Sequence, residues 1–356
     1  MTQSAGAGLN VVSIGGGTGL ATLLSGLKHH VFHHTETQIS LLEPFIETLT
    51  AVVTVTDDGG SSGRLREEFQ MLPPGDIRNC LVALAEDERL LTRLFRYRFD
   101  SDGDLSGHSF GNLFLTALSD VTGDFLEAIK LTSEVLAIKG RIFPSTMEDV
   151  SLVADLADGR TIEGETKIVN SRTRINRLRL SKPDCQPLPE TLDAIKRADL
   201  ITIGPGSLYT SLIPNLLVEG IVKAISETAG ATVYVCNIMT QPGETDGFSV
   251  EDHIEALLEY SPLLRLDYVV VNSAPVSTAS LDKYLADGAT QVVQRTRGKL
   301  DLQRPLQTRL IAGDLVSDKD VVRHDPDKLA GLLLQKVARQ PASRLAAEPS
   351  SQNRGS

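Results

Sequence analysis

The sequence predicts an α/β fold with a mostly parallel sheet, and three features of its pattern support this prediction. Residues 10–27 read in order as a strand, a glycine-rich loop and a helix, and residues 200–227 repeat that order. Residues 49–55 are β-branched and apolar, as is typical of a strand buried in a parallel sheet. A β-rich stretch near 140–180 is expected to form a small excursion from this core.

Composition narrows the class of protein. With 356 residues, 41% hydrophobic and 23% charged, the chain resembles an ordinary globular protein. A net charge of −11 argues against a nucleic-acid partner. The sequence has neither a run of about 18 apolar residues nor a signal peptide, so no membrane insertion is expected. Three unpatterned cysteines favour reduced thiols in a cytoplasmic protein over disulfides or a zinc site.

The first glycine loop lies between a strand expected at 11–14 and a helix expected at 21–28. Glycine lets a backbone approach a ligand closely, and the amides at a helix N-terminus attract anions. The loop is therefore either a phosphate site or a tight turn. Leu20 replaces the third glycine of a dinucleotide fingerprint, which argues against a standard NAD site. The candidate phosphate-binding residues are Gly15, Gly16, Gly17, Thr18 and Gly19.

Residues 29–48 are expected to lie on the surface of the protein. The histidines in this stretch lack the nearby acidic or cysteine partners of a familiar metal site, so a solvated surface is favoured. They are His29, His30, His33 and His34. Residues 35–48 read as an insertion.

The strand at 49–55 ends in a loop rich in Asp, Gly and Ser, where open α/β sheets bind their ligands. An Asp here could accept from a ribose hydroxyl, or Asp57 and Asp58 could hold a Mg²⁺ that neutralises a diphosphate. The alternative is a turn whose Asp residues cap the next helix, expected at 64–70. Ser61, Ser62 and Arg64 complete the candidates of this loop.

Two further loops lead into helices. Asp76 is expected to cap a helix that runs to Glu86, and Asn79 on that helix joins the candidate ligand-binding residues. Arg78 and Arg64 each either reach a phosphate or pair with a local carboxylate. In the second loop His108 either faces the ligand crevice or is a hydrogen-bonded structural histidine. Asn112 follows it, and helices are expected at 113–119 and 125–136.

The excursion near 140–180 consists of short strand-like runs at 150–156, 161–165 and 175–180. Asp158-Gly159 between the first two runs is a hairpin signal. An arginine-rich run at 172–179 favours the solvated face of a strand over a binding surface.

The α/β pattern then resumes with a helix at 192–197 and a strand at 200–203. The glycine loop after this strand adds the candidates Gly204, Gly206 and Ser207, and two such loops in one sheet could clamp a diphosphate from both sides. Further strands are expected at 232–236, 268–271 and 310–311, and further helices at 251–259, 280–287 and 327–339. Residues 1–9 and 340–356 are expected to be disordered, leaving one α/β domain at 10–339.

Taken together, the loops at 14–19, 56–64, 74–80, 108–112, 204–211 and 237–245 resemble those of the YvcK family of bacterial gluconeogenesis factors. That family lies in the CofD-like superfamily, whose other branch is 2-phospho-L-lactate transferase. The resemblance covers about residues 11–339, and the departures are the histidine-rich insertion, the stretch at 295–309 and the tail.

The resemblance implies a cytoplasmic, Rossmann-like three-layer sandwich that binds UDP-sugars such as UDP-N-acetylglucosamine. It also implies a role in gluconeogenic growth and in cell shape through the supply of cell-wall precursors. The family's ligand contacts in the C-terminal third match Tyr284 and Arg323 best. A homo-oligomer and a cell-wall or metabolic protein partner are further expectations.

The sequence and the resemblance together allow three functions. A nucleotide-sugar-binding regulator without turnover is favoured. The alternative is a metal-dependent transferase of the phospholactyl type that uses a nucleotide diphosphate donor, with Mg²⁺ at Asp57 and Asp58. Dinucleotide-dependent oxidoreduction ranks last, because Leu20 interrupts the fingerprint and no proton donor can be identified.

Overall fold

The computed structural model describes residues 8–32, 44–86, 90–100, 102–303, 307–317 and 321–337 of the chain. Leu9 already begins the first strand. The predicted tails at 1–7 and 340–356, together with His33, His34 and the first part of the predicted insertion, lie outside the described residues.

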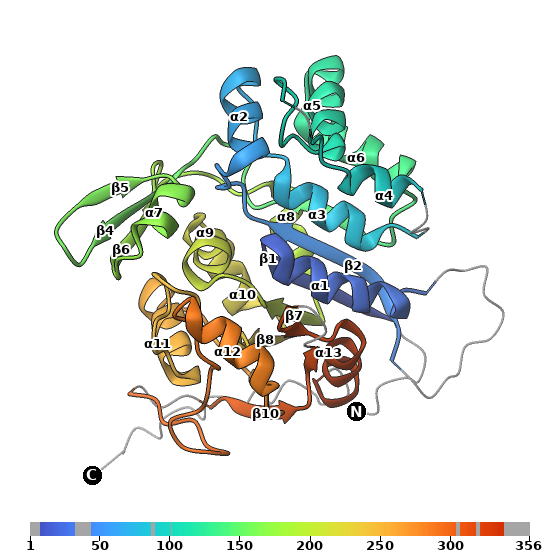
Figure 1. The fold of residues 1–356 in the computed structure, drawn as a ribbon. Helices are drawn as coiled ribbons and strands as arrows, with labels where there is room; N and C mark the ends of the chain where they lie inside the picture. The colour runs from blue at the N-terminus through green and yellow to red at the C-terminus, as the bar shows by residue number, and fades with distance from the viewer. Residues whose placement is uncertain are drawn as a thin grey trace, which may run out of the picture.

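A seven-stranded sheet forms the centre of the molecule, with the strand order β10-β9-β8-β7-β1-β2-β3 (Figure 1). Every neighbouring pair in it is parallel. Its strands are β1 (Leu9–Gly15), β2 (Ile46–Val53), β3 (Arg141–Pro144), β7 (Leu200–Ile203), β8 (Ala231–Val235), β9 (Tyr268–Asn272) and β10 (Arg309–Gly313). From β1 the chain first builds one side of the sheet and then returns to build the other from β7. The β1–β7 boundary is therefore a topological switch point, where such sheets bind ligands.

Helices cover both faces of the sheet, which confirms the predicted three-layer α/β sandwich. On one face α1 (Gly17–Leu27) packs between α3 (Gly75–Leu84) and α13 (Pro326–Leu332). The other face carries α8 (Pro189–Arg197), α9 (Ile213–Leu217), α10 (Ile221–Glu227) and α11 (Val250–Tyr260). The α1–α13 approach is close, because a Cβ on Gly26 would lie 2.1 Å from the Pro326 carbonyl oxygen.

Four helices extend from the β2–β3 side of the sheet (Figure 1). They are α2 (Gly60–Phe69), α4 (Leu91–Arg96), α5 (Phe110–Thr122) and α6 (Phe125–Val135). Side-chain caps start two of them: Ser109 accepts from the Asn112 amide at 3.2 Å, and Asp124 accepts from the Glu127 amide at 3.0 Å. Helix α2 begins at Gly60 and not at Arg64, so Ser61 to Gly63 lie on a helix and not in the loop that the sequence predicts.

The β-rich excursion is a separate antiparallel sheet of β4 (Leu152–Leu156), β5 (Thr161–Glu163) and β6 (Ile175–Leu180). The predicted hairpin at Asp158-Gly159 is confirmed, since β4 and β5 pair there and Gly159 has φ +87°. A short helix, α7 (Glu165–Ser171), was not predicted. Strand β3 belongs to the central sheet, so the excursion is narrower than 140–180.

The remaining elements lie at the C-terminal side. They are α12 (Thr278–Ala286), β11 (Val316–Ser317) and β12 (Arg323–His324). Three short irregular helices complete the fold: η1 (Lys28–His30), η2 (Leu208–Leu212) and η3 (Leu333–Val337). Within the described residues no single helix is long and apolar enough to cross a membrane. One pair, Leu208–Leu217 with Ile221–Glu227, reaches that length and composition only together, and it is bent by 79°.

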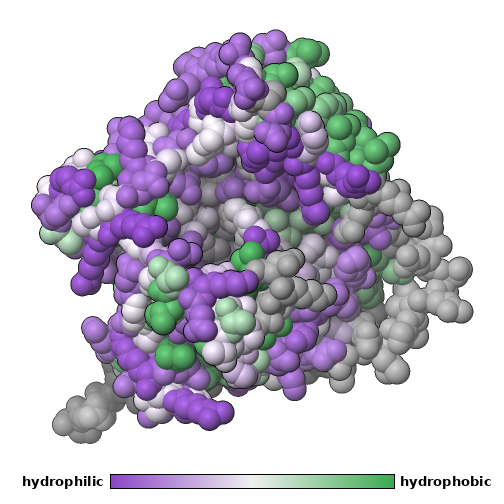
Figure 2. Space-filling view, in the orientation of Figure 1, coloured by the Kyte–Doolittle hydropathy of each residue, from purple (hydrophilic) through white to green (hydrophobic). Residues whose placement is uncertain are grey.

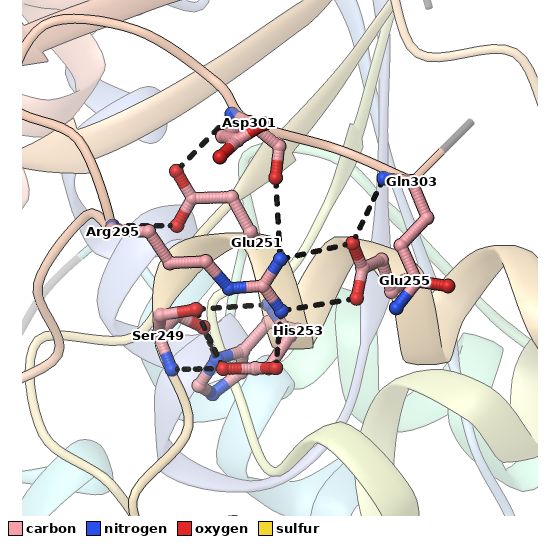
Figure 3. A network of polar contacts seen from close by, with 8 residues as sticks. Ser249, Glu251, His253, Glu255, Arg295, Asp301 and Gln303 are labelled. Atoms are coloured by element: carbon pink, nitrogen blue, oxygen red, sulfur yellow. Dashed lines mark hydrogen bonds and ion pairs between the residues drawn. The ribbon is translucent and has the colours of Figure 1, made fainter. Parts of the chain in front are cut away.

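An ion-pair network fixes the segment at 295–303 onto α11 (Figure 3). The Arg295 guanidinium donates to Asp252 at 2.5 Å and to Glu255 at 3.1 and 3.2 Å. The Arg295 amide donates to Glu251 at 2.9 Å, and the Gln303 amide donates to Glu255 at 3.2 Å. One short stretch of helix thus orders a segment far from it in the sequence.

Candidate functional site

A cavity of about 350 Å³ lies beyond the carboxyl ends of β1 and β7, at the switch point of the sheet. The face of the molecule drawn in Figure 2 is hollowed between the α2–α5 side and α12. Residues from five separate parts of the chain line this cavity. Its lining includes Gly16 to Gly19, Pro205 to Ser207, Ser211, Asn237 to Gln241, Tyr284 and Val322 to His324.

The first glycine loop presents the start of α1 to this cavity. Helix geometry leaves the amides of the first turn, among them those of Thr18 and Gly19, without an acceptor in the helix. Thr18 is exposed and Gly19 half-buried, so a ligand can reach both. A Cβ on Gly16 would lie 2.6 Å from a carboxylate oxygen of Asp76, so only glycine fits there. The loop thus offers backbone donors to an anion.

The two glycine loops touch each other directly. A Cβ on Gly19 would lie 2.5 Å from the Pro205 carbonyl oxygen and 2.8 Å from the Gly206 Cα. The sequence predicted that two such loops would flank one ligand, and the structure brings them to one cavity.

Side chains from beyond β8 hold the second loop in place. The Asn237 side chain accepts from the Gly206 amide at 3.1 Å and donates to the Gly206 carbonyl at 2.7 Å. Gln241 Nε2 donates to Ser207 Oγ at 2.6 Å. Neither residue was selected from the sequence. Both amide side chains do follow the carboxyl end of a strand, where ligand sites of this fold lie.

The helix that follows the second loop does not present its N-terminus to the cavity. The Glu244 carboxylate accepts from the backbone amides of Tyr209 and Thr210, at the start of η2. Burial raises the pKa of Glu244 to about 7, and those amides act in the opposite direction. The second loop is therefore not equivalent to the first, and its contribution to a ligand comes from Gly206 and Ser207.

The third wall of the cavity contains the two residues expected from the C-terminal third. Tyr284 on α12 donates its hydroxyl to the Val322 carbonyl at 3.5 Å, and Arg323 follows Val322 on the exposed edge. Burial lowers the pKa of the adjacent His324 to about 4, although its ring is bonded to the Cys236 backbone. His324 is therefore neutral at physiological pH. Tyr284 and Arg323 thus line the same cavity as the two glycine loops.

Ten of the predicted ligand-binding residues lie outside this lining. Ser61 Oγ is 3.0 Å from His108 Nδ1, and Asn112 Nδ2 donates to Ser61 Oγ at 3.1 Å. These three buried side chains tie α2 to α5. The residues outside the lining are Gly15, Asp57, Asp58, Ser61, Ser62, Arg64, Asn79, His108, Asn112 and Gly204.

The two carboxylates expected to share a Mg²⁺ point to different helices. Asp58 accepts from the Thr166 amide at 2.8 Å and from its hydroxyl at 2.6 Å, at the start of α7. Asp57 accepts from the Gly59 amide at 2.9 Å, and its other oxygen would be 2.5 Å from a Cβ on Gly75, at the start of α3. Among the described residues no group of three or more His, Cys, Asp or Glu side chains could hold a metal ion. The side chains of Asp57 and Asp58 therefore do not fit the predicted shared ion.

Asp76 connects these outer residues to the cavity. The sequence predicts Asp76 as an N-cap, but Pro74 occupies that position and Asp76 lies in the first turn of α3. Its carboxylate accepts from the Gly17 amide, at the first residue of α1. Desolvation and the neighbouring Asp57 raise the pKa of Asp76 to about 7, against the opposing effects of Gly17, Arg78 and Asn79. A carboxyl group with a pKa near neutral pH is thus hydrogen-bonded to the first glycine loop.

A second cavity, of about 540 Å³, lies between η2 and α11. Its lining contains Arg174, Tyr209, Phe248 and the Arg295 group shown in Figure 3. The Arg295 charge is already neutralised by Asp252 and Glu255. This cavity lacks the convergence of two glycine loops, so the smaller cavity is the better ligand site.

Comparisons with known proteins agree with this geometry. A family model described as 2-phospho-L-lactate transferase CofD matches residues 11–315. A protein of Nostoc sp., provisionally named a gluconeogenesis factor, is 49% identical over 330 residues, which cover 92% of this chain and 68% of that protein. A gluconeogenesis factor of Bacillus subtilis is 42% identical over 327 residues, covering 91% of this chain and 96% of the relative. The crystal structure of a Bacillus halodurans protein has a TM-score of 0.83 and 41% identity, and covers 92% of this chain and 100% of its own.

Proposed function

This chain belongs to the CofD family, among its gluconeogenesis factors, and from that membership we propose that it is a cytoplasmic nucleotide-sugar-binding regulator. Its ligand is a UDP-sugar of the UDP-N-acetylglucosamine type. Its role is to support growth on gluconeogenic carbon sources and to match cell-wall precursor supply, and with it cell shape, to that growth. The names of the relatives support the gluconeogenic part of the proposal.

One observation carries the ligand assignment, namely the contact of two glycine loops at the switch point of a parallel sheet. The amides of Thr18 and Gly19, together with Gly206 and Ser207, form the donor set for a diphosphate. Arg323 adds a cation, and Tyr284 adds an aromatic ring and a hydroxyl for the nucleoside or the sugar.

The lining of the cavity supports binding over turnover. Among the described residues that line it, none is Asp or Glu. Its one histidine, His324, is buried and bonded to the Cys236 backbone. A general base must reach the proton that it removes, and these residues offer none in that position. A regulator needs only a ligand that stabilises one conformation over another.

A transferase of the phospholactyl type is the second candidate, because the matching family model carries that description. The observation that favours it is the carboxyl pair of Asp57 and Asp76 beside the first loop, where desolvation and then the charge of Asp57 raise the pKa of Asp76. Release of nucleotide from a diphosphate donor, lost in Asp57→Asn, would support this function. Asp58→Asn is the less informative variant, since Asp58 anchors α7.

The first experiment is a thermal-shift and calorimetric titration with UDP-N-acetylglucosamine, UDP and NAD. At about 100 times its dissociation constant, a ligand adds about 2.7 kcal/mol to the free energy of unfolding. We expect UDP-N-acetylglucosamine to raise the melting temperature and NAD to leave it unchanged. Arg323→Ala should lower the affinity about tenfold or more. Arg174→Ala in the second cavity is the matched control and should have no effect. Absence of a shift with every UDP-sugar tested would refute the proposal.

A further inference from the structure

Two arginines bind the loop at 106–108, and a third lies close to the start of the helix that follows it. Arg64 on α2 donates to the Ser106 carbonyl at 2.6 Å, and Arg98, just after α4, donates to the next carbonyl, that of Gly107. Arg78 on α3 packs close to Gly111 at the start of α5, where a Cβ would lie 2.9 Å from its Cδ. Two guanidinium groups thus bind adjacent carbonyls, and the third lies on the neighbouring helix.

The charges of these arginines are not neutralised by the described part of the chain. Arg64 and Arg98 donate to backbone carbonyls, and Arg78 donates to the Asn79 side chain at 2.7 Å. None of the three forms an ion pair within 4.0 Å among the described residues, whereas Arg66, Arg160 and Arg295 each do. Each guanidinium has five N–H donors, so most of them are left for another acceptor.

The pKa shifts of Arg78 and His108 show that the positive charges of this group lie close together. Desolvation and the cations Arg98 and Arg96 lower the pKa of Arg78, although Asp76 and Asp57 oppose them. Desolvation and the cations Arg64 and Arg98 lower the pKa of His108, against the opposing charge of Glu68. The nearby acids are thus too far away to form ion pairs, and like charges face one another.

His108 adds a donor to this group. Asn112 donates to Ser61 Oγ, which leaves the Ser61 hydroxyl proton for His108 Nδ1, 3.0 Å away. In this arrangement the neutral ring carries its proton on Nε2. The group then consists of guanidinium and imidazole N–H donors.

We propose that Arg64, Arg78, Arg98 and His108 form a binding subsite for the phosphoryl group of a second small-molecule ligand. A phosphate has three acceptor oxygens that match the planar fork of a guanidinium, and it would supply the charge that these arginines lack. The subsite is separate from the nucleotide-sugar cavity, since none of its four residues lines that cavity and Asp76 lies between them. The protein would then bind two ligands, one on each side of Asp76.

Titration with inorganic phosphate, followed by ³¹P NMR line broadening and calorimetry, tests this proposal. The titration is done with the cavity saturated by UDP-N-acetylglucosamine, so that the glycine loops do not contribute. We expect phosphate to bind, and Arg64→Gln and Arg98→Gln each to weaken it by about tenfold or more. Arg93→Gln, an exposed arginine on α4 outside the group, is the matched control and should leave the affinity unchanged.

A loosened loop is the competing explanation for such a loss, because Arg64 and Arg98 also hold loop carbonyls. Arg98→Lys keeps the charge and a donor but cannot bind a phosphate with two parallel hydrogen bonds, so its affinity should lie between those of wild type and Arg98→Gln. Equal phosphate affinity in wild type, Arg64→Gln and Arg98→Gln would overturn the proposal, and so would an equal loss in Arg93→Gln. If UDP-N-acetylglucosamine does not bind, the proposed function fails, but a loss confined to the Arg64 and Arg98 variants still establishes the subsite.

Discussion

The charge of Asp76, beside the first glycine loop, changes near neutral pH. Its folded-state pKa is about 7, whereas an unfolded Asp has a pKa of about 3.9. Between those values the folded protein holds a proton that the unfolded chain has released, so Asp76 lowers the free energy of unfolding as the pH rises from about 4 to about 7. Asp76→Asn should remove this pH dependence. The free energy of unfolding of the variant, relative to that of wild type, should therefore rise by roughly 3 kcal/mol between pH 5 and pH 8. Denaturant titration at both pH values measures the difference.

The pH dependence of ligand affinity tests the ionisation of Asp76 independently of stability. Above pH 7 the ionised Asp76 repels a diphosphate bound at Thr18 and Gly19, so UDP-N-acetylglucosamine should bind more tightly at pH 6 than at pH 8. In Asp76→Asn the pH dependence should be weaker, while the Asn oxygen still accepts from the Gly17 amide. An unchanged pH profile in the variant would show that another group is responsible.

Asn237 is predicted to affect ligand affinity indirectly, by holding the backbone of Gly206. Removing its side chain in Asn237→Ala breaks two hydrogen bonds, of 3.1 and 2.7 Å, and should cost about 1–3 kcal/mol of stability. UDP-sugar affinity should fall about tenfold, because the Gly206 amide is no longer held toward the cavity.

A matched control for Asn237 exists at the end of β9. The Asn272 side chain likewise bonds loop backbone, accepting from Leu315 at 3.0 Å and donating to Ala274 at 2.7 Å, but it does not line the cavity. Asn272→Ala should lose comparable stability and keep its ligand affinity. Equal affinity losses in the two variants would mean that general destabilisation explains both.

At the scale of elements, the start of α1 must pass very close to the second loop. In Gly19→Ala the new Cβ would lie 2.5 Å from the Pro205 carbonyl, so the loops must separate. We expect a loss of about 1–3 kcal/mol from this overpacking, and a loss of ligand binding. Gly331→Ala in α13 meets nothing within 4 Å and should instead gain about 0.5–1 kcal/mol from helix propensity. Chemical denaturation of both variants, with and without UDP-N-acetylglucosamine, separates the two effects.

The elements also show which parts of the fold the local sequence pattern can predict. The strand at 200–203, the Asp158-Gly159 hairpin and both glycine loops were predicted, because each depends on neighbours in the sequence. The start of α2 was not, because Gly60 to Gly63 favour a loop locally and only packing against α5 makes them helical. Likewise α7 is capped by Asp58 from 108 positions away, and Asp76 meets Gly17 only in the folded chain. Such distant contacts, which the sequence pattern does not contain, also decide which of the predicted ligand residues line the cavity.

At the scale of the whole molecule, the cavity joins the two halves of the sheet. One half brings the start of α1 at the end of β1, and the other brings the loops after β7 and β8 and the segment at 322–324. A ligand that contacts both halves would favour a conformation in which the two halves lie together as they do here. This coupling is what a ligand-dependent regulator requires.

Helix α12 is the part of the molecule in which this coupling should be measurable. None of its described residues is buried, and its Tyr284 reaches the cavity wall at Val322 through one hydrogen bond of 3.5 Å. Few buried contacts mean a low free energy of local opening, so α12 should exchange its amide hydrogens quickly in the free protein. A UDP-sugar that contacts Tyr284 should slow this exchange several-fold, as hydrogen-exchange mass spectrometry would detect. Helix α11, with seven buried residues and a capping box, should stay protected in both states. Tyr284→Ala should abolish the change in α12, and unaltered exchange in ligand-saturated wild type would exclude this helix from the response.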